Sequence, residues 1–150
     1  MKNLFEPAEV DDVKTRIRQL DTSRRAQWGT MNVAQALAHC AASFHIALGE
    51  ERPPRMLIGR IIGRLVKPLA LGNDAPMRKN SPTVPGLVIT DERDLEVERG
   101  RLLNAIDRFV AASPAGCARH PHSFFGRLTP DEWAVLMYKH LDHHLRQFGG

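Results

Sequence analysis

Three of the chain's seven histidines, His140, His143 and His144, lie within five residues near the C-terminus. Histidine is the commonest metal ligand near neutral pH. Residues four apart lie on one side of a helix, so His140 and His144 can point at a single ion. The spacing alone is weak evidence, because a 150-residue chain with seven histidines contains such a pair by chance in roughly a third of cases.

The position of this pair on its predicted helix adds weight to the spacing. With His140 set to zero, Trp133, Met137 and His144 fall between about 20° and 80°, on the face that should enter the core. His143 lies on the flank, about 60° from His140. A buried imidazole is unfavourable unless its nitrogens find partners. A metal ion would provide them, but so would ordinary carbonyls or carboxylates, and the pattern leaves both explanations open.

A third ligand would have to come from another helix, and His39 is the best candidate because it borders the apolar side of a predicted helix over 30–48. His45 points about 240° away from His39 on that helix, so we expect it at the surface. His120 and His122 precede the last helix and are expected to be turn residues.

Cys40 occupies the middle of the same apolar side. We expect a buried, small apolar residue there, because no basic neighbour other than His39 would activate its thiol. The sequence also lacks a glycine-rich phosphate loop, a G-x-S-x-G elbow and an H-E-x-x-H motif.

Four helices are predicted to position these residues. The first runs over about 7–20, the second over 30–48, and the third begins with the acids of 90–92 and ends before Ser113. The fourth has the clearest start, since Thr129 can cap it, Pro130 suits its first turn, and Glu132 completes a capping box. Four helices with one long connection predict an all-α protein, a four-helix bundle in a single domain over 1–150.

The long connection between the second and third helices contains "RPPRMLIGRIIGRLVKPLA". On a helix its cations fall on one face, and Leu57, Ile58, Ile61 and Leu65 fall on the other. We favour a crossover helix lying on the bundle, because two glycines and a proline weaken an isolated helix. The alternative is a helix that lies on a membrane surface. The only short candidate for a strand is 86–90.

The composition restricts the function further. No stretch approaches the roughly 20 apolar residues of a membrane span. The net charge is +4, but the basic residues are scattered and no nucleic-acid-binding motif accompanies them, so no nucleic-acid partner is expected. Two cysteines suggest no disulfide framework and the N-terminus no secretory signal, so we expect a cytoplasmic protein.

The segment "WGTMNVAQALAH", combined with the final "HLDHHLRQF", resembles the DinB-like superfamily, which includes the YfiT-like metal-dependent hydrolases. Within it the chain is most similar to an uncharacterised bacterial branch, in which "PMRKN" and "HPHSFFGRLTPDEW" also have counterparts. The resemblance implies a four-helix bundle with a metal-binding triad of His39, His140 and His144. Homodimers are common among such proteins, and several relatives transfer low-molecular-weight thiols or isomerise thiol adducts.

Three neutral imidazoles leave a fourth position open on zinc or nickel. Bound water there has a pKa lowered to about 7, and a bound thiol ionises. We therefore expect a metal-dependent enzyme of thiol-transfer or hydrolytic type acting on a small molecule, with a low-molecular-weight thiol as a candidate cofactor. Gln147 is the candidate to orient a ligand or substrate, and His143 the candidate proton carrier. The alternative is a non-catalytic helical bundle that binds a small ligand or a protein partner, with structural histidines or a stabilising metal.

Overall fold

The computed structural model describes residues 1–112 and 114–150, and the regular secondary structure of this part of the chain is helical. It contains five α-helices and one short 3-10 helix, and its only β-type pairing is an isolated bridge between His122 and Gly126. The elements are α1 (Pro7–Gln19), α2 (Val33–Ala47), α3 (Leu57–Leu71), η1 (Pro85–Leu87), α4 (Leu95–Ala112) and α5 (Pro130–Gln147). The predicted all-α class is confirmed.

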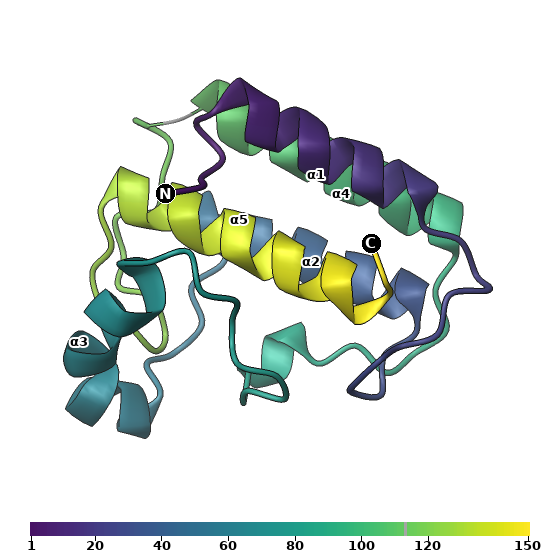
Figure 1. Ribbon diagram of the computed structural model, residues 1–150. Coiled ribbons are helices and arrows are strands. Elements are labelled where there is room, and N and C mark those ends of the chain that lie inside the picture. Colours follow the sequence, from purple (N-terminus) through teal and green to yellow (C-terminus); the bar gives the residue numbers. More distant parts are fainter. Residues whose placement is uncertain (113) are drawn as a thin grey trace.

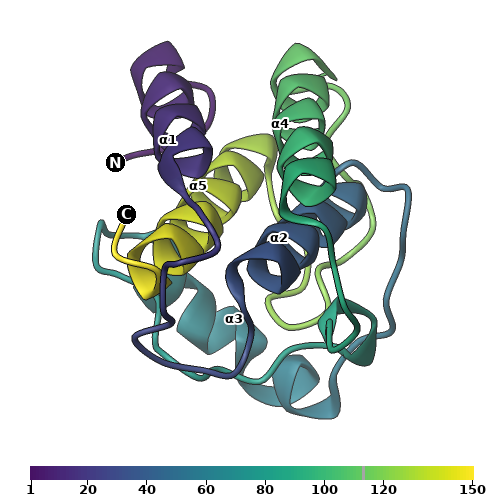
Figure 2. The same ribbon diagram turned by 90° about the vertical axis from the view of Figure 1, so that its right-hand side faces the viewer.

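Helices α1, α2, α4 and α5 lie side by side, and α3 lies apart from them (Figures 1 and 2). Helix α2 packs against α4 and α5, and α1 packs against the same two helices. Each helix contributes apolar side chains to one core, whose burial is the main stabilising term. The largest fully buried members are Trp133, Phe44, Phe109, Leu4, Ile17, Leu102, Ile106, Met137, Leu141, Leu145, Val13 and Cys40.

The two helices that carry the histidines of interest both begin with a capping box. In α2, Asn32 accepts from the backbone N–H of Gln35 at 2.9 Å, and the Gln35 side chain accepts from the N–H of Asn32 at 2.9 Å. In α5, Thr129 and Glu132 make the same reciprocal pair, at 3.2 and 2.8 Å. The start of α5 confirms its predicted capping box, whereas α2, expected over 30–48, begins at Val33. Each cap contributes about 1 kcal/mol.

Two boundary predictions are wrong. Helix α4 begins at Leu95, because Asp94 accepts from the N–H of Val97 at 2.9 Å and so supplies the cap that was expected from 90–92. The short candidate for a strand over 86–90 does not form one: Pro85–Leu87 is the 3-10 helix η1, in which Pro85 fixes the backbone at the first position, and 88–90 have no regular secondary structure. Ser113, where α4 was expected to end, lies outside the described residues; α4 continues to Ala112.

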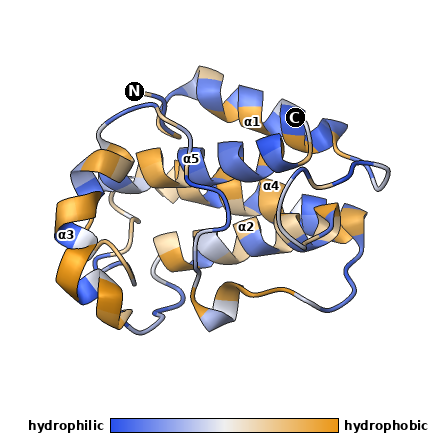
Figure 3. Cartoon of the chain, turned by 60° about the horizontal axis from the view of Figure 1, so that its bottom comes forward, coloured by the Kyte–Doolittle hydropathy of each residue, from blue (hydrophilic) through white to orange (hydrophobic). Residues whose placement is uncertain are grey.

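The crossover helix exists as α3, but it packs through an unexpected face. Apolar residues make up much of this helix (orange in Figure 3), and Leu57, Ile61 and Leu65 are 77%, 77% and 75% exposed. The buried face instead carries Gly59 and Gly63. A Cβ added at Gly63 would lie 2.0 Å from the carbonyl oxygen of Phe124, so the missing side chain is what permits this close approach.

None of the helices in the described part of the chain combines the length and the apolar content needed to cross a bilayer. Helix α3 is amphipathic and only 15 residues long.

Candidate metal centre

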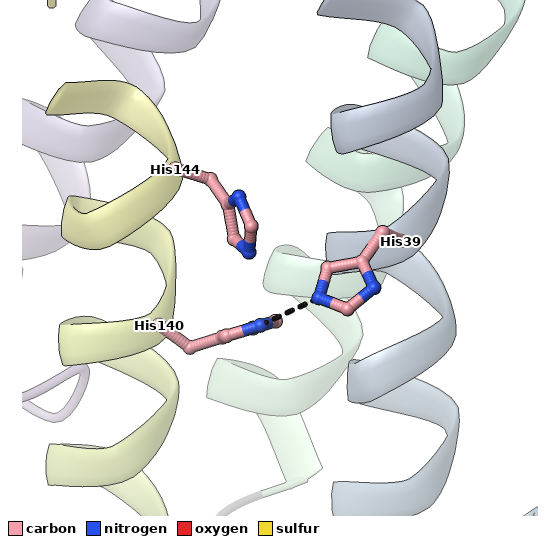
Figure 4. A group of neighbouring side chains, drawn as sticks. All are labelled: His39, His140 and His144. Carbon is pink, nitrogen blue, oxygen red and sulfur yellow. Dashed lines mark hydrogen bonds between the residues drawn. The ribbon is translucent and has the colours of Figure 1, made fainter. Parts of the chain in front are cut away.

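Three imidazoles from two helices converge between α2 and α5 (Figure 4). His39 comes from α2, and His140 and His144 lie one turn apart on α5. One ring nitrogen of each lies within 4.8 Å of the other two, and the ring centroids are 4.7 to 4.8 Å apart. Residues about 100 positions apart in sequence therefore meet in one group, which can bind a metal ion.

The ring of His39 is oriented by a backbone carbonyl. Its Nδ1 lies 2.7 Å from the carbonyl oxygen of Leu87 in η1. Because a carbonyl can only accept, Nδ1 carries the proton and donates it. The lone pair of Nε2 is then free to face the other two histidines. A backbone or carboxylate partner on the far nitrogen is the usual support of a metal-binding histidine.

The ring of His144 is fixed by a longer chain of hydrogen bonds. Gln147 donates through Nε2 to the carbonyl of Trp28 at 2.6 Å, so its Oε1 must be the atom 2.8 Å from His144 Nδ1. An amide oxygen only accepts, which places the proton of His144 on Nδ1 and leaves Nε2 free. Gly29, with a φ of +75°, leaves room for this amide, since a Cβ there would lie 2.8 Å from Gln147 Nε2.

His140 has no such support. Its Nε2 lies 2.9 Å from Nε2 of His39, which is an acceptor, so without a metal His140 Nε2 donates this bond. Its Nδ1 is fully covered and has no hydrogen-bond partner among the described residues. A buried polar atom without a partner is costly. The group of three is therefore incompletely satisfied by the protein alone.

All three rings are held in the neutral form that binds metals. Burial lowers the pKa of His39, although its bond to Leu87 opposes this. Burial, followed by the neighbouring charges of His144 and His39, lowers the pKa of His140 well below its usual range. Burial is also the main reason why the pKa of His144 falls to about 3. Protonation in the pH range of a cell would not compete with a cation here.

His143 lies beside this group but faces a different set of neighbours. Its Nε2 accepts from Trp28 Nε1 at 3.3 Å, and Lys79 lies over the Trp28 ring at 4.2 Å from the centroid. Burial lowers the pKa of His143, and a hydrogen bond with the backbone of Met77 raises it. Both sides of the ring are thus engaged with the loops that cover α5, and its role as a proton carrier stays a prediction.

The other histidines lie outside the group. His45 pairs with Glu50 on the surface of α2, as expected. His122 is a turn residue, as predicted, but it is largely buried against Trp133, and its Nδ1 accepts from the backbone N–H of Phe124 at 3.1 Å. Burial lowers its pKa to about 4. Cys40 is 1% exposed, and burial raises the pKa of its thiol, which fits the predicted inert core residue.

Sequence reasoning missed the partners that orient the ligands. The carbonyls of Leu87 and Trp28 could not be found, because any residue type offers a carbonyl. The Trp28 ring and the loop around Met77 could have been suspected, because both lie in segments that carry the family resemblance. The role of Gln147 was foreseen only as a general orienting group; the structure places it against His144.

Comparison with known proteins gives one match. The model of a family described as "Protein of unknown function (DUF1569)" matches residues 3–149, nearly the whole chain. No curated protein matches the chain, and no solved structure matches it.

Proposed function

This chain belongs to the family described as "Protein of unknown function (DUF1569)", and we propose that it is a metal-dependent enzyme of thiol-transfer or hydrolytic type. His39, His140 and His144 would hold one divalent ion, with zinc or nickel preferred by a set of imidazole nitrogens. We also propose that α1, α2, α4 and α5 form the four-helix bundle of the DinB-like superfamily. The placement of the three histidines on the second and the last of these helices supports that assignment.

The observation that carries the proposal is the direction of the three rings. His39 and His144 each donate Nδ1–H to an oxygen of the protein, which leaves both Nε2 lone pairs facing His140. Two rings oriented in this way direct their Nε2 atoms toward the ring of the third, His140, so three neutral imidazoles meet at a point where a divalent cation could bind.

When bound, a divalent ion with three imidazole ligands supplies a Lewis acid with room for a water or a thiol. The chain's own groups have separate tasks. Gln147 holds His144 in one tautomer and is itself held by the carbonyl of Trp28. Trp28 and His143 lie beside the site: the indole N–H donates to His143 Nε2, and the His143 ring lies 5.0 Å from that of His144.

A second candidate function is a non-catalytic bundle in which a metal, or the hydrogen bonds alone, stabilises the fold. The 2.9 Å contact between the Nε2 atoms of His39 and His140 supports this alternative, because a hydrogen bond there joins α2 to α5 without any ion. Any substrate would have to approach through the small part of His140 and His144 that is exposed to solvent.

Elemental analysis of the natively purified protein tests the metal site. We expect about one metal ion per chain in the wild type and in the surface variant His45→Ala, and none in His140→Ala. The same three proteins should then be assayed with a low-molecular-weight thiol and an electrophilic acceptor, and with simple ester and amide substrates. If His140→Ala loses both the metal and the activity, the result supports the proposal of a metal-dependent enzyme.

The outcomes separate the two candidates. A wild type that contains no metal and takes none up removes the basis of the enzyme proposal. Metal bound without any turnover favours the stabilising role, in which His144→Ala lowers the melting temperature and abolishes no reaction. A thiol transfer that persists in His140→Ala would place the chemistry elsewhere.

A further inference from the structure

Helix α3 presents an apolar face that no part of the described chain covers. Leu57, Ile61, Leu65 and Leu69 are 73 to 77% exposed, and Ile58 is 55% exposed. Isolated exposed leucines are ordinary, but a contiguous row along one helix face indicates an interaction surface. The helix is held to the protein by its opposite, glycine-bearing face, so the apolar row faces away from the core.

A cationic groove runs alongside this face. It has a volume of about 870 Å³ and lies between α3 and the loop before α5. Pro121, Phe125 and Gly126 give it an apolar wall. Its charged lining is entirely basic: Arg55, Arg60, Arg64, Lys67 and Arg127.

Some of the basic side chains that line the groove have partners within the protein, and others do not. Arg55 donates to the carbonyls of Ser123 and Gly59, and Lys67 pairs with Glu132 at 2.8 Å, so these two fasten α3 to the loop. Arg60 and Arg64 are exposed, and their guanidinium groups have no hydrogen bond or ion pair with any described residue. Two unpaired guanidinium groups at one groove are suited to bind an anion such as a phosphate group.

The arginines also lie between the apolar face and the glycine face of α3. At 100° per residue, with Leu57 at zero, the exposed apolar residues span about 0° to 120°, and Arg60 and Arg64 lie near −60° and −20°. A helix with an apolar face bordered by cations is typical of segments that lie in the plane of a membrane surface, with the apolar side chains at the boundary of headgroups and acyl chains.

We propose that α3 docks the protein onto an anionic membrane surface, with its apolar face inserted and Arg60 and Arg64 binding phosphate groups of the lipid headgroups. Charge complementarity selects this partner, because every ionisable residue that lines the groove is basic. The surface is separate from the histidine group, so this proposal does not depend on the metal site.

A second copy of the chain is a poorer occupant of the same face. A 15-residue helix is roughly 22 Å long, and a face about 10 Å wide then offers roughly 220 Å². Stable protein–protein interfaces bury about 800 Å² on each partner. Two copies facing each other would also bring their unpaired arginines together, which is unfavourable.

Co-sedimentation of the full chain with lipid vesicles tests the proposal. We expect binding to vesicles of phosphatidylcholine and phosphatidylglycerol in equal amounts, little binding to phosphatidylcholine alone, and release at high salt. The double variant Arg60→Gln, Arg64→Gln should lower the partition coefficient by roughly fivefold for each arginine. Ile61→Asp should lower it more than tenfold, because a charge replaces an inserted apolar side chain.

Matched controls use residues on other faces of the molecule. Val97→Asp lies on α4 and is 49% exposed in the wild type, and Arg18→Gln with Arg25→Gln removes two other exposed arginines. These variants should sediment as the wild type does, and circular dichroism should be the same for all of them. Equal losses in the controls and in the α3 variants would contradict the proposal.

Three further outcomes overturn it. The first is an absence of sedimentation with anionic vesicles at low salt. The second is binding of inorganic phosphate, measured by calorimetry, without any binding to vesicles, which would identify a site for a free anion. The third is a concentration-dependent dimer, measured by sedimentation velocity, that Ile61→Asp converts to a monomer.

Discussion

Helices α5 and α3 are both amphipathic, but they pack in opposite ways. Helix α5 buries its apolar face, with Trp133 and Met137 each 1% exposed, whereas α3 leaves Leu57 and Ile61 each 77% exposed. The hydrophobic pattern of each sequence identifies its apolar face correctly. It does not identify the face that packs against the rest of the protein. In α3 that face is set by Gly63, which lets the backbone of Phe124 approach closely.

The two helices also differ in where their polar groups lie. Helix α5 buries Asp142 and Lys139, each with partners: Asp142 accepts from Arg16 at 2.9 Å and from Arg146 at 2.7 Å, and Lys139 donates to the carbonyl of Ala70 at 2.6 Å. Helix α3 keeps its unpaired arginines in solvent. Buried polar groups usually have complete hydrogen bonding; among the described side chains of α5, His140 Nδ1 is the buried atom that lacks a partner.

The largest effect should come from acid, which protonates the largely buried histidines, among them His144 and His122 in the loop that contacts α3. The pKa of His122 is about 4 in the folded protein and about 6.5 in the unfolded chain, so between these values the unfolded state binds more protons. The contribution of neutral His122 to the free energy of unfolding is therefore fully present above pH 6.5. It is lost as the pH falls to 4, which lowers the free energy of unfolding by on the order of 3 kcal/mol. Urea unfolding across this range measures it.

His122→Asn provides the control for the acid effect. Asparagine can still accept from the N–H of Phe124 but does not titrate, so the free energy of unfolding should depend less on pH in this variant than in the wild type. Identical pH dependence in the two proteins would show that His122 does not contribute.

Next in size should be the effect of a methyl group on the face through which α3 packs. Gly63→Ala places a Cβ 2.0 Å from a backbone oxygen, so the helix must shift, at a cost of about 2 kcal/mol. In contrast, a Cβ at Gly100 of α4 meets nothing within 4 Å, and Gly100→Ala should stabilise the protein by about 0.5–1 kcal/mol. Chemical denaturation checks both, and equal effects would refute the packing role of the glycine.

A smaller effect is expected from the residue that orients His144. Gln147→Leu removes the acceptor for His144 Nδ1–H, so the affinity for zinc should fall by about 10- to 100-fold. A chelator competition titration measures this, with the exposed Gln19→Leu as the matched control. Unchanged affinity in Gln147→Leu would mean that the tautomer of His144 does not matter for binding.

The smallest effect belongs to the cap of α5. Thr129→Ala removes the acceptor for the N–H of Glu132 and should cost about 1 kcal/mol of unfolding free energy. Helix α3 has no side-chain cap at its start, so no comparable loss is available there. The exposed loop variant Thr83→Ala serves as the control and should change the unfolding free energy by much less.

The sequence alone was enough to predict the elements whose signals lie within a few neighbouring residues. The capping residue Thr129 predicted the start of α5, and the helical periodicity placed His140 and His144 on one face of that helix. It failed where the structure depends on contacts between distant segments. Nothing local distinguishes Gly63 as a packing residue, because its partner is the backbone of Phe124 in another segment.

The convergence of the histidines was only partly accessible. The spacing on α5 and the position of His39 made the group a hypothesis, and the family resemblance made it specific. The hydrogen bonds that fix the rings depend on Leu87 and Trp28, whose carbonyls carry no sequence signature.

The most direct test of the central claim is X-ray absorption spectroscopy of the protein loaded with one zinc ion per chain. If His39, His140 and His144 converge on one ion, the spectrum should contain three imidazole nitrogens at about 2.0–2.1 Å and no sulfur, since the thiol of Cys40 is buried in the core. In His39→Ala the count should fall to two. A zinc spectrum with one imidazole or none, or one that His39→Ala leaves unchanged, would contradict the account.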